Sequence, residues 1–190
     1  SEPPGRLWCG TVSGDLCYRD PGSKWIRVEP PFRPMIKIEA LEATYGARAA
    51  LLAVSYRGNL AVSHDYGQTW ITRFPELTDE IIRTIHHHPL HPGYVLAGTQ
   101  TGLFCSPDSG RSWTRFMNRM DTNAITAIAF DTQDPLTFFI ADSDGFSGRV
   151  LMTTNGGFNF EVILEGEDYF SQIHTLIYQE STQSRSEERR

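Results

Sequence analysis

Residues 96–113 read Leu-Ala-Gly-Thr-Gln-Thr-Gly-Leu-Phe-Cys-Ser-Pro-Asp-Ser-Gly-Arg-Ser-Trp, and the end of this segment is a motif that occurs four times in the 190-residue chain. The motif is a hydroxyl side chain, then Asp or Asn, then Gly, then an aromatic residue, with one or two residues between them. The four aromatic residues are separated by 45, 43 and 47 positions and are Trp25, Trp70, Trp113 and Phe160. Self-similarity at a near-constant period predicts a repeat architecture.

Each copy of the motif has the residues of a tight turn that is held by its own side chains. An Asp or Asn side chain accepts backbone N–H groups a few residues further on, and Gly permits the positive φ of a reversal. We expect the aromatic ring that follows to be buried. The motif is therefore interpreted as structural at Asp20, Gly22, Trp25, Ser63, Asp65, Gly67, Trp70, Ser106, Asp108, Gly110, Trp113, Thr153, Asn155, Gly157 and Phe160. The first copy departs from the pattern, because Tyr18 stands in place of the hydroxyl residue.

Short alternating strands surround every copy, about four to each period of roughly 45 residues. Four antiparallel strands in such a period are typical of one blade of a β-propeller. The sequence thus predicts an all-β propeller over residues 1–178, with blades at about 7–29, 37–74, 81–116 and 124–164.

The motif resembles the Asp-box, also called the BNR repeat, and the resemblance extends over roughly residues 7–178. Such repeats occur in sialidases, xyloglucan-cleaving glycosidases, sortilin-type receptors and a photosystem II assembly factor. The resemblance implies the propeller fold and leaves the function open, since one fold serves many functions.

The first repeat lacks its first strand, because the chain enters directly at Leu7. The alternating segment 173–178 has the pattern of the missing strand, and joining it to 7–29 gives a ring of four blades without exposed sheet edges. The alternative is that the chain is part of a larger propeller, as a fragment or as a homodimer. Residues 179–190 contain no apolar residue and are expected to be a disordered tail.

Composition excludes several classes of function. The chain has 17 Lys and Arg against 23 Asp and Glu, a net charge of -6. This acidic balance argues against nucleic acid and anionic membranes as partners. No apolar run approaches the roughly 20 residues of a membrane helix, and residues 1–5 lack the features of a signal peptide. Three cysteines do not form a disulfide framework. This count weakly favours a reducing compartment such as the cytoplasm.

Three features that invite a metal or a reactive thiol have plainer interpretations, and we predict neither a metal nor a cofactor. Cys17 and Cys105 occupy the motif position of Val62 and Met152, which indicates side-chain packing. In the cluster 86–91, His-His-His-Pro-Leu-His, residues 88–91 align with a turn at 131–134 that begins and ends with Asp, which favours a turn over a metal site. The loop 142–148 lacks the spacing and the bidentate Glu of an EF-hand, which favours a turn over a cation or ligand contact.

The sequence favours a non-catalytic module over an enzyme. Glycoside hydrolysis usually requires two carboxylates that flank the bond, and no pair is singled out by its spacing. Sialidases of this resemblance carry a Phe/Tyr-Arg-Ile-Pro element, whereas residues 32–34 read Phe-Arg-Pro and lie after the first motif.

Loops at one rim of the propeller are the expected binding surface, because loops on a rigid scaffold carry function. We expect a rigid binding or assembly module with a protein partner, and the alternative is a glycoside hydrolase or a carbohydrate-binding propeller. The expected contact residues are Phe32, Arg33, Tyr56, Arg57, Met117, Arg119, Asp121, Asp144, Tyr169 and Phe170.

Overall fold

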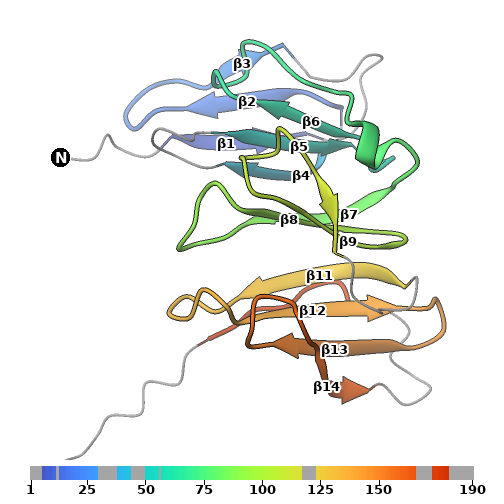
Figure 1. Cartoon of the computed structure of the whole chain (residues 1–190). Helices are drawn as coiled ribbons and strands as arrows, with labels where there is room; N and C mark the ends of the chain where they lie inside the picture. The colour runs from blue at the N-terminus through green and yellow to red at the C-terminus, as the bar shows by residue number, and fades with distance from the viewer. Residues whose placement is uncertain are drawn as a thin grey trace, which may run out of the picture.

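The computed structural model describes residues 6–11, 13–29, 50–55, 57–116, 123–165 and 173–179, together with the backbone of 38–43. Apart from a short 3-10 helix η2 (Pro75–Leu77), the regular elements of these residues are all β-strands. Four antiparallel sheets follow one another along the chain and stack face to face (Figure 1). The all-β propeller architecture predicted from the repeats is therefore confirmed.

Each sheet contains strands that are consecutive in the sequence. The first is formed by β1 (Leu7–Gly10), β2 (Leu16–Arg19) and β3 (Ile26–Val28). The second is formed by β4 (Ile38–Ala43), β5 (Leu51–Ser55) and β6 (Leu60–Ser63). The third is formed by β7 (Ile82–His87), β8 (Val95–Thr99), β9 (Gly102–Ser106) and β10 (Thr114–Arg115). The fourth is formed by β11 (Ala124–Phe130), β12 (Phe138–Ser143), β13 (Gly148–Thr153) and β14 (Glu161–Glu165).

The sheets pack through apolar residues that alternate along the strands. In β8, Val95 and Ala97 face a core shared with the second sheet, whereas Leu96 faces a core shared with the fourth. This is the period of two of a strand that is buried on both faces. The third sheet is therefore enclosed on both sides, with β7 lying next to β4 on one side and next to β11 on the other.

The outer strand of the second sheet is shorter than the sequence predicts. The period of four strands predicts an outer strand at the end of the 37–74 blade, but pairing is confined to a bridge in which Val62 and Ile71 exchange N–H···O bonds of 2.9 and 2.8 Å. Pro75 follows at the first position of η2. Because proline lacks an N–H donor and η2 turns the chain away, the edge pairing ends there.

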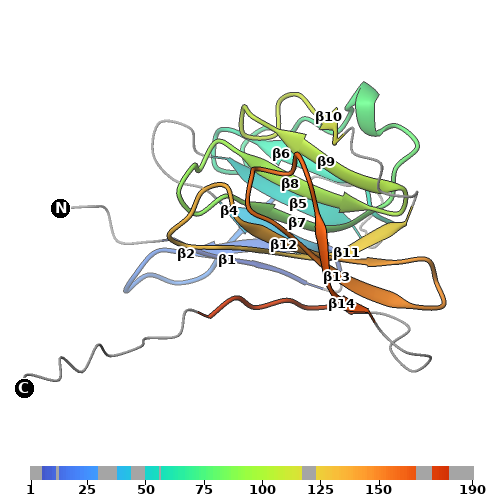
Figure 2. The same cartoon turned by 60° about the horizontal axis from the view of Figure 1, so that its bottom comes forward.

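The closure of a four-bladed ring through residues 173–178 is not found, and the expected joining of 173–178 with 7–29 needs correction. The Thr126 hydroxyl of β11 donates to the Ile173 carbonyl, and the Phe139 ring of β12 stacks on Tyr178 at 5.2 Å. The segment thus lies against the fourth sheet (Figure 2). The segment covers the face of β12 that points away from the third sheet. Without the segment, the Phe139 ring on that face would be more exposed. The described sheets do not close, which agrees with the alternative of a partial propeller.

Candidate functional site

The second, third and fourth motifs form turns that are latched by their own side chains. In the third, the Ser106 hydroxyl accepts from the Gly110 amide at 2.8 Å and donates to Asp108 at 2.8 Å. The Asp108 carboxylate also accepts from the Ser112 amide at 2.9 Å and the Ser112 hydroxyl at 2.6 Å. The backbone turns through positive φ at Ser109 (62°) and Gly110 (85°). At this copy the motif side chains hold the turn closed.

The carboxylates in these turns are held in the charged form. Hydrogen bonds from the Thr69 hydroxyl and amide lower the pKa of Asp65 to about 2. In the fourth copy Asn155 replaces the acid, and its Oδ1 accepts from the Asn159 amide at 3.0 Å. The uncharged amide oxygen of Asn155 therefore accepts the backbone hydrogen bond that a carboxylate accepts in the second and third motifs.

The first motif is the exception, and here the sequence expectation was wrong in part. The Asp20 carboxylate does not latch the turn but accepts two hydrogen bonds from Arg6, at 2.7 and 3.1 Å. Ser23 closes the turn instead, donating its hydroxyl to the Asp20 carbonyl at 2.8 Å. The Trp25 ring was expected to be buried but is 48% exposed, whereas Trp113 is 2% exposed. Trp113 is buried because it is sealed in the core between the second and third sheets.

His86 and His87 end strand β7, and His88 to His91 form a turn, as the alignment with 131–134 predicts. The His88 Nδ1 accepts from the amides of Leu90 and His91 at 3.1 and 3.2 Å. The Asp131 carboxylate does the same for Gln133 and Asp134 at 2.7 and 3.0 Å. Burial lowers the pKa of His88. With Nδ1 as acceptor, the neutral ring donates from Nε2 to the Pro135 carbonyl at 3.0 Å and ties the third sheet to the fourth.

The connections of the described sheets gather at two opposite rims. At one rim, the latched turns meet the loops between first and second strands, through Ser109 N to Gly93 O at 2.8 Å and Gly156 N to Leu136 O at 2.8 Å. At the other, the connection from the second sheet to the third meets the loops between second and third strands. There the Ile82 amide donates to Gly58 O at 3.1 Å and the Gln100 amide donates to Ile81 O at 3.0 Å. We call this second rim, formed in the described chain by 57–59, 75–81, 100–101 and 142–148, the loop rim.

A buried polar residue stands at the loop-rim end of the second strand in three sheets. Ser55, Thr99 and Asp142 each lie opposite the start of a β-bulge in the preceding strand, and they are 1%, 0% and 0% exposed. The Ser55 hydroxyl accepts from the Asn59 amide at 3.1 Å. The Thr99 hydroxyl accepts from the Thr101 amide at 3.2 Å and donates to Glu80 at 2.6 Å. These buried hydroxyls therefore hold the backbone of the adjoining loops by hydrogen bonds.

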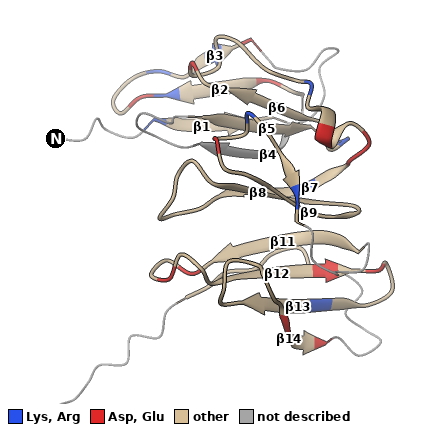
Figure 3. Cartoon of the chain, in the orientation of Figure 1, with Lys and Arg blue, Asp and Glu red and all other residues tan. Residues whose placement is uncertain are grey.

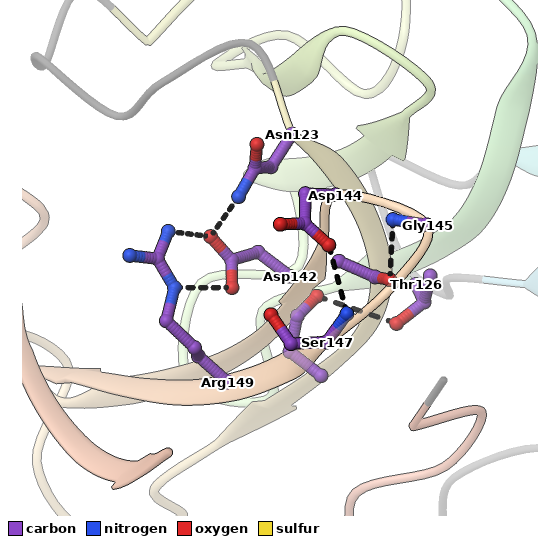
Figure 4. A network of polar contacts seen from close by, with 9 residues as sticks. Asn123, Thr126, Asp142, Asp144, Gly145, Ser147 and Arg149 are labelled. Atoms are coloured by element: carbon purple, nitrogen blue, oxygen red, sulfur yellow. Dashed lines mark hydrogen bonds and ion pairs between the residues drawn. The ribbon is translucent and has the colours of Figure 1, made fainter. Parts of the chain in front are cut away.

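In the fourth sheet this position is a charge pair. The Asp142 carboxylate accepts from Arg149 Nε at 3.1 Å and Nη2 at 2.5 Å, and from Asn123 Nδ2 at 3.1 Å (Figure 4). Figure 3 shows the acidic segment of β12 beside the basic segment of β13. The Asp142 side chain is 1% exposed and that of Arg149 is 25% exposed. A two-pronged guanidinium–carboxylate contact fixes the geometry of the hairpin base.

The loop above this pair, 142–148, is a turn that presents an aromatic ring. The Asp144 carboxylate accepts from the amides of Phe146 and Ser147, both at 2.8 Å, and the Ser143 hydroxyl accepts from Gly145 N at 3.1 Å. These backbone hydrogen bonds lower the pKa of Asp144. Phe146 is 87% exposed at the tip. The sequence analysis identified the loop 142–148 but not Phe146. The sequence signal for Phe146 was a single aromatic residue among Gly, Ser and Asp.

The structure places two of the ten expected contact residues. Arg57 is exposed in the β5–β6 turn and Asp144 is exposed in the β12–β13 loop, so both lie on the loop rim. The others fall outside the described residues: Phe32, Arg33, Tyr56, Met117, Arg119, Asp121, Tyr169 and Phe170.

The stacked antiparallel sheets and their latched turns define a β-propeller of the Asp-box class. The chain belongs to the Sortilin-Vps10 family, whose model, described as "Sortilin, neurotensin receptor 3", matches residues 58–189. No curated protein sequence matches the chain significantly.

Solved propellers share the fold at low sequence identity. YCF48 bound to D1 peptide is 17% identical over 86% of this chain and 52% of that chain, with a TM-score of 0.61. The GH74 enzyme of Niastella koreensis is 12% identical over 84% of this chain and 27% of that chain, with a TM-score of 0.62. A chain of the nidogen/laminin complex is 10% identical over 86% of this chain and 63% of that chain, with a TM-score of 0.61. The chain thus spans about half of YCF48 and about a quarter of the GH74 enzyme.

Propellers similar to this chain therefore include both a glycoside hydrolase and proteins that bind other proteins or peptides. In the described residues, no helix has the length and apolar character needed to cross a membrane.

Proposed function

We propose that this chain is a rigid, non-catalytic binding module whose loop rim binds a protein partner. The observation that carries the proposal is Phe146, which is 87% exposed on a loop that several hydrogen bonds hold in place. Aromatic side chains are enriched among the residues that dominate protein–protein binding energy. A loop that is already ordered loses little conformational freedom when a partner binds.

Other features of the loop rim support a site for a protein or peptide. Arg57 is exposed on the same rim, and exposed arginine and aromatic residues are typical of protein interfaces. Three of the carboxylates on this rim are engaged in hydrogen bonds: Glu80 accepts from the Thr99 and Thr101 hydroxyls at 2.6 and 2.5 Å, and Asp142 and Asp144 hold the hairpin. Glu76 and Asp79, on the same rim, are exposed. The carboxylates of Glu80, Asp142 and Asp144 therefore serve the fold.

The test is a selection from a random-peptide display library on the immobilised chain, with a glycan array and xyloglucan oligosaccharides screened in parallel. We expect enriched peptides whose affinity falls about tenfold or more in Phe146→Ala, the loss of about 1.4 kcal/mol that a truncated interface anchor commonly exceeds. Arg57→Ala is expected to cause a smaller loss.

Phe158→Ala is the matched control. Phe158 is 79% exposed and follows the fourth latched turn at the opposite rim, so its removal is expected to leave peptide affinity unchanged. Binding to glycans alone, release of reducing sugar from xyloglucan, or equal losses in both Phe variants would contradict the proposal.

A further inference from the structure

Two cysteines face each other across the first hairpin. In the antiparallel pair β1–β2, Cys9 lies directly opposite Cys17. Directly opposite residues of an antiparallel pair project from the same face of the sheet. The two thiols are close enough for a hydrogen bond between them, and both are free. The repeat alignment had indicated only side-chain packing for Cys17, because it compares one strand with its equivalents and not with its neighbour.

The register gives this pair a separation that suits a disulfide. At the end of the hairpin the Thr11 amide donates to the Asp15 carbonyl at 2.9 Å. Hydrogen-bonded and non-hydrogen-bonded pairs alternate along an antiparallel ladder, so Cys9–Cys17, two positions away, is of the wider kind with Cα atoms roughly 5.5 Å apart. Disulfides join Cα atoms that are about 4.4–6.8 Å apart, most often near 5.5–6 Å. The backbone separation therefore fits a disulfide, and the Cβ atoms, ordinarily about 4.5–5.5 Å apart in opposed pairs, must approach slightly for the bond to form.

The pair lies on the side of the first sheet that points away from the second. Trp8 and Tyr18, the neighbouring opposed residues, project from the other face, with ring centroids 5.1 Å apart. A Cβ placed on Gly67 of the second sheet would lie 3.5 Å from the Trp8 ring, which marks that face as the packed one. Cys9 and Cys17 are both partly exposed on the opposite face. A small reagent therefore reaches them.

We propose that Cys9 and Cys17 are a modification site at which a low-molecular-weight disulfide oxidises the two thiols to an intrachain disulfide that joins β1 to β2. One thiolate attacks a sulfur of the reagent, forms a mixed disulfide and releases one reagent thiol. The second thiolate then attacks the protein sulfur, forms Cys9–Cys17 and releases the other reagent thiol. Two protein S–H bonds and one reagent S–S bond are exchanged for one protein S–S bond and two reagent S–H bonds, so two electrons pass to the reagent.

The surroundings of the pair determine how fast this exchange proceeds. Burial raises the pKa of Cys17, and the nearby Cys9 raises it further. Because the thiolate is the nucleophile, the rate is expected to increase as the pH rises above neutrality. The neighbour of Cys17 on β3 is Arg27, so a single thiol partner, Cys9, adjoins it on the described sheet.

Cys105 is the matched control within the chain. Its opposed neighbours are Leu96 on β8 and Thr114 on β10, and burial raises its pKa. It has no thiol neighbour in the described sheet, so it cannot close an intrachain bond there.

The experiment treats the folded chain with oxidised glutathione at pH 8 and follows intact mass and non-reducing peptide maps, in the natural sequence and in Cys105→Ser. We expect both proteins to lose two hydrogen atoms and to yield a Cys9–Cys17 cross-linked peptide that dithiothreitol removes. Cys17→Ser is expected to give a glutathione adduct on Cys9 without a cross-link. The oxidised chain is expected to melt about 5 °C higher than the reduced one, since the bond closes a short loop.

Glutathione adducts on Cys9 and Cys17 without a cross-link in Cys105→Ser would overturn the proposal. So would a cross-link that forms only in denaturant, or one that includes Cys105. The peptide map of the Cys105→Ser protein identifies the bond even if Cys17→Ser fails to fold.

Discussion

Arg149 contacts the Asp142 carboxylate through two hydrogen bonds, Nε to Oδ1 at 3.1 Å and Nη2 to Oδ2 at 2.5 Å, at the position where the third sheet buries the hydroxyl of Thr99. Where the third sheet has a neutral hydroxyl, the fourth sheet therefore has an ion pair, and this pair lies at the base of the loop 142–148. A buried charge that loses its partner is much less stable than either arrangement.

Removing Arg149 is consequently expected to be more damaging than removing the whole pair. Arg149→Ala should lower the free energy of unfolding by about 3 kcal/mol, because it leaves the Asp142 carboxylate buried with Asn123 alone. The double variant Asp142→Thr/Arg149→Ala, which copies the third sheet, should recover most of that loss. Urea unfolding measures both. A double variant no more stable than Arg149→Ala would show that the pair is not the source of the effect.

The latched and unlatched motifs should respond differently to the loss of their acid. Asp108→Ala removes the acceptor of hydrogen bonds from Ser106, Arg111 and Ser112 and is expected to cost about 2–3 kcal/mol. Asp20→Ala removes only a half-exposed ion pair with Arg6 and is expected to be much less destabilising. Thermal unfolding of the two variants provides the comparison. Equal destabilisation would mean that the Asp108 network adds nothing beyond a surface contact.

The second latch makes stability depend on acid pH. The pKa of Asp65 is about 2 in the folded chain, below the ordinary value of about 3.9. As the pH falls, the unfolded chain binds this proton first, so the contribution of Asp65 is complete above about pH 4 and is lost as the pH falls through about 2. Asp65→Asn, which copies the uncharged Asn155 latch, should unfold with a weaker dependence on pH between 4 and 2. Denaturant unfolding across this range measures the slope, and identical slopes would exclude Asp65 as a contributor.

The C-terminal segment offers a test of its own placement. Tyr178 stacks on Phe139, whereas the preceding Ile177 is 85% exposed. Tyr178→Ala is expected to cost about 1 kcal/mol and to speed amide exchange in β12, because an aromatic pair is worth that order of energy beyond its burial. Ile177→Ala should change neither. Faster exchange in β1 instead of β12 would favour the ring closed through the first sheet.

Local features of this fold could be predicted because the interactions are close in sequence. The Ser106–Asp108–Ser112 latch and the His88 turn each lie within a few residues, so residue type and spacing determine them. The partner of segment 173–178 could not be determined in this way. Its alternating pattern suits pairing with the edge strand β1 and equally suits packing on an apolar sheet face, so the pattern does not distinguish the two.

The candidate site was less predictable than the fold. Trp25 has the same motif position as Trp113, yet its burial depends on a second sheet stacking against it, which a repeat pattern does not report. The Asp142–Arg149 pair depends on the register across a loop of irregular length. Phe146 was missed because a single aromatic in a turn resembles an ordinary exposed residue until the hydrogen bonds that hold its backbone are known.

Because Trp113 is buried and Trp25 is half exposed, tryptophan fluorescence can report on the packing of the sheets. An indole sealed between two sheets emits at shorter wavelength than one in water, so separation of the second and third sheets should shift the emission of Trp113 to the red while that of Trp25 stays nearly constant. A version that keeps Trp113 and carries Phe at positions 8, 25 and 70 would therefore follow the opening of one inter-sheet seam in real time.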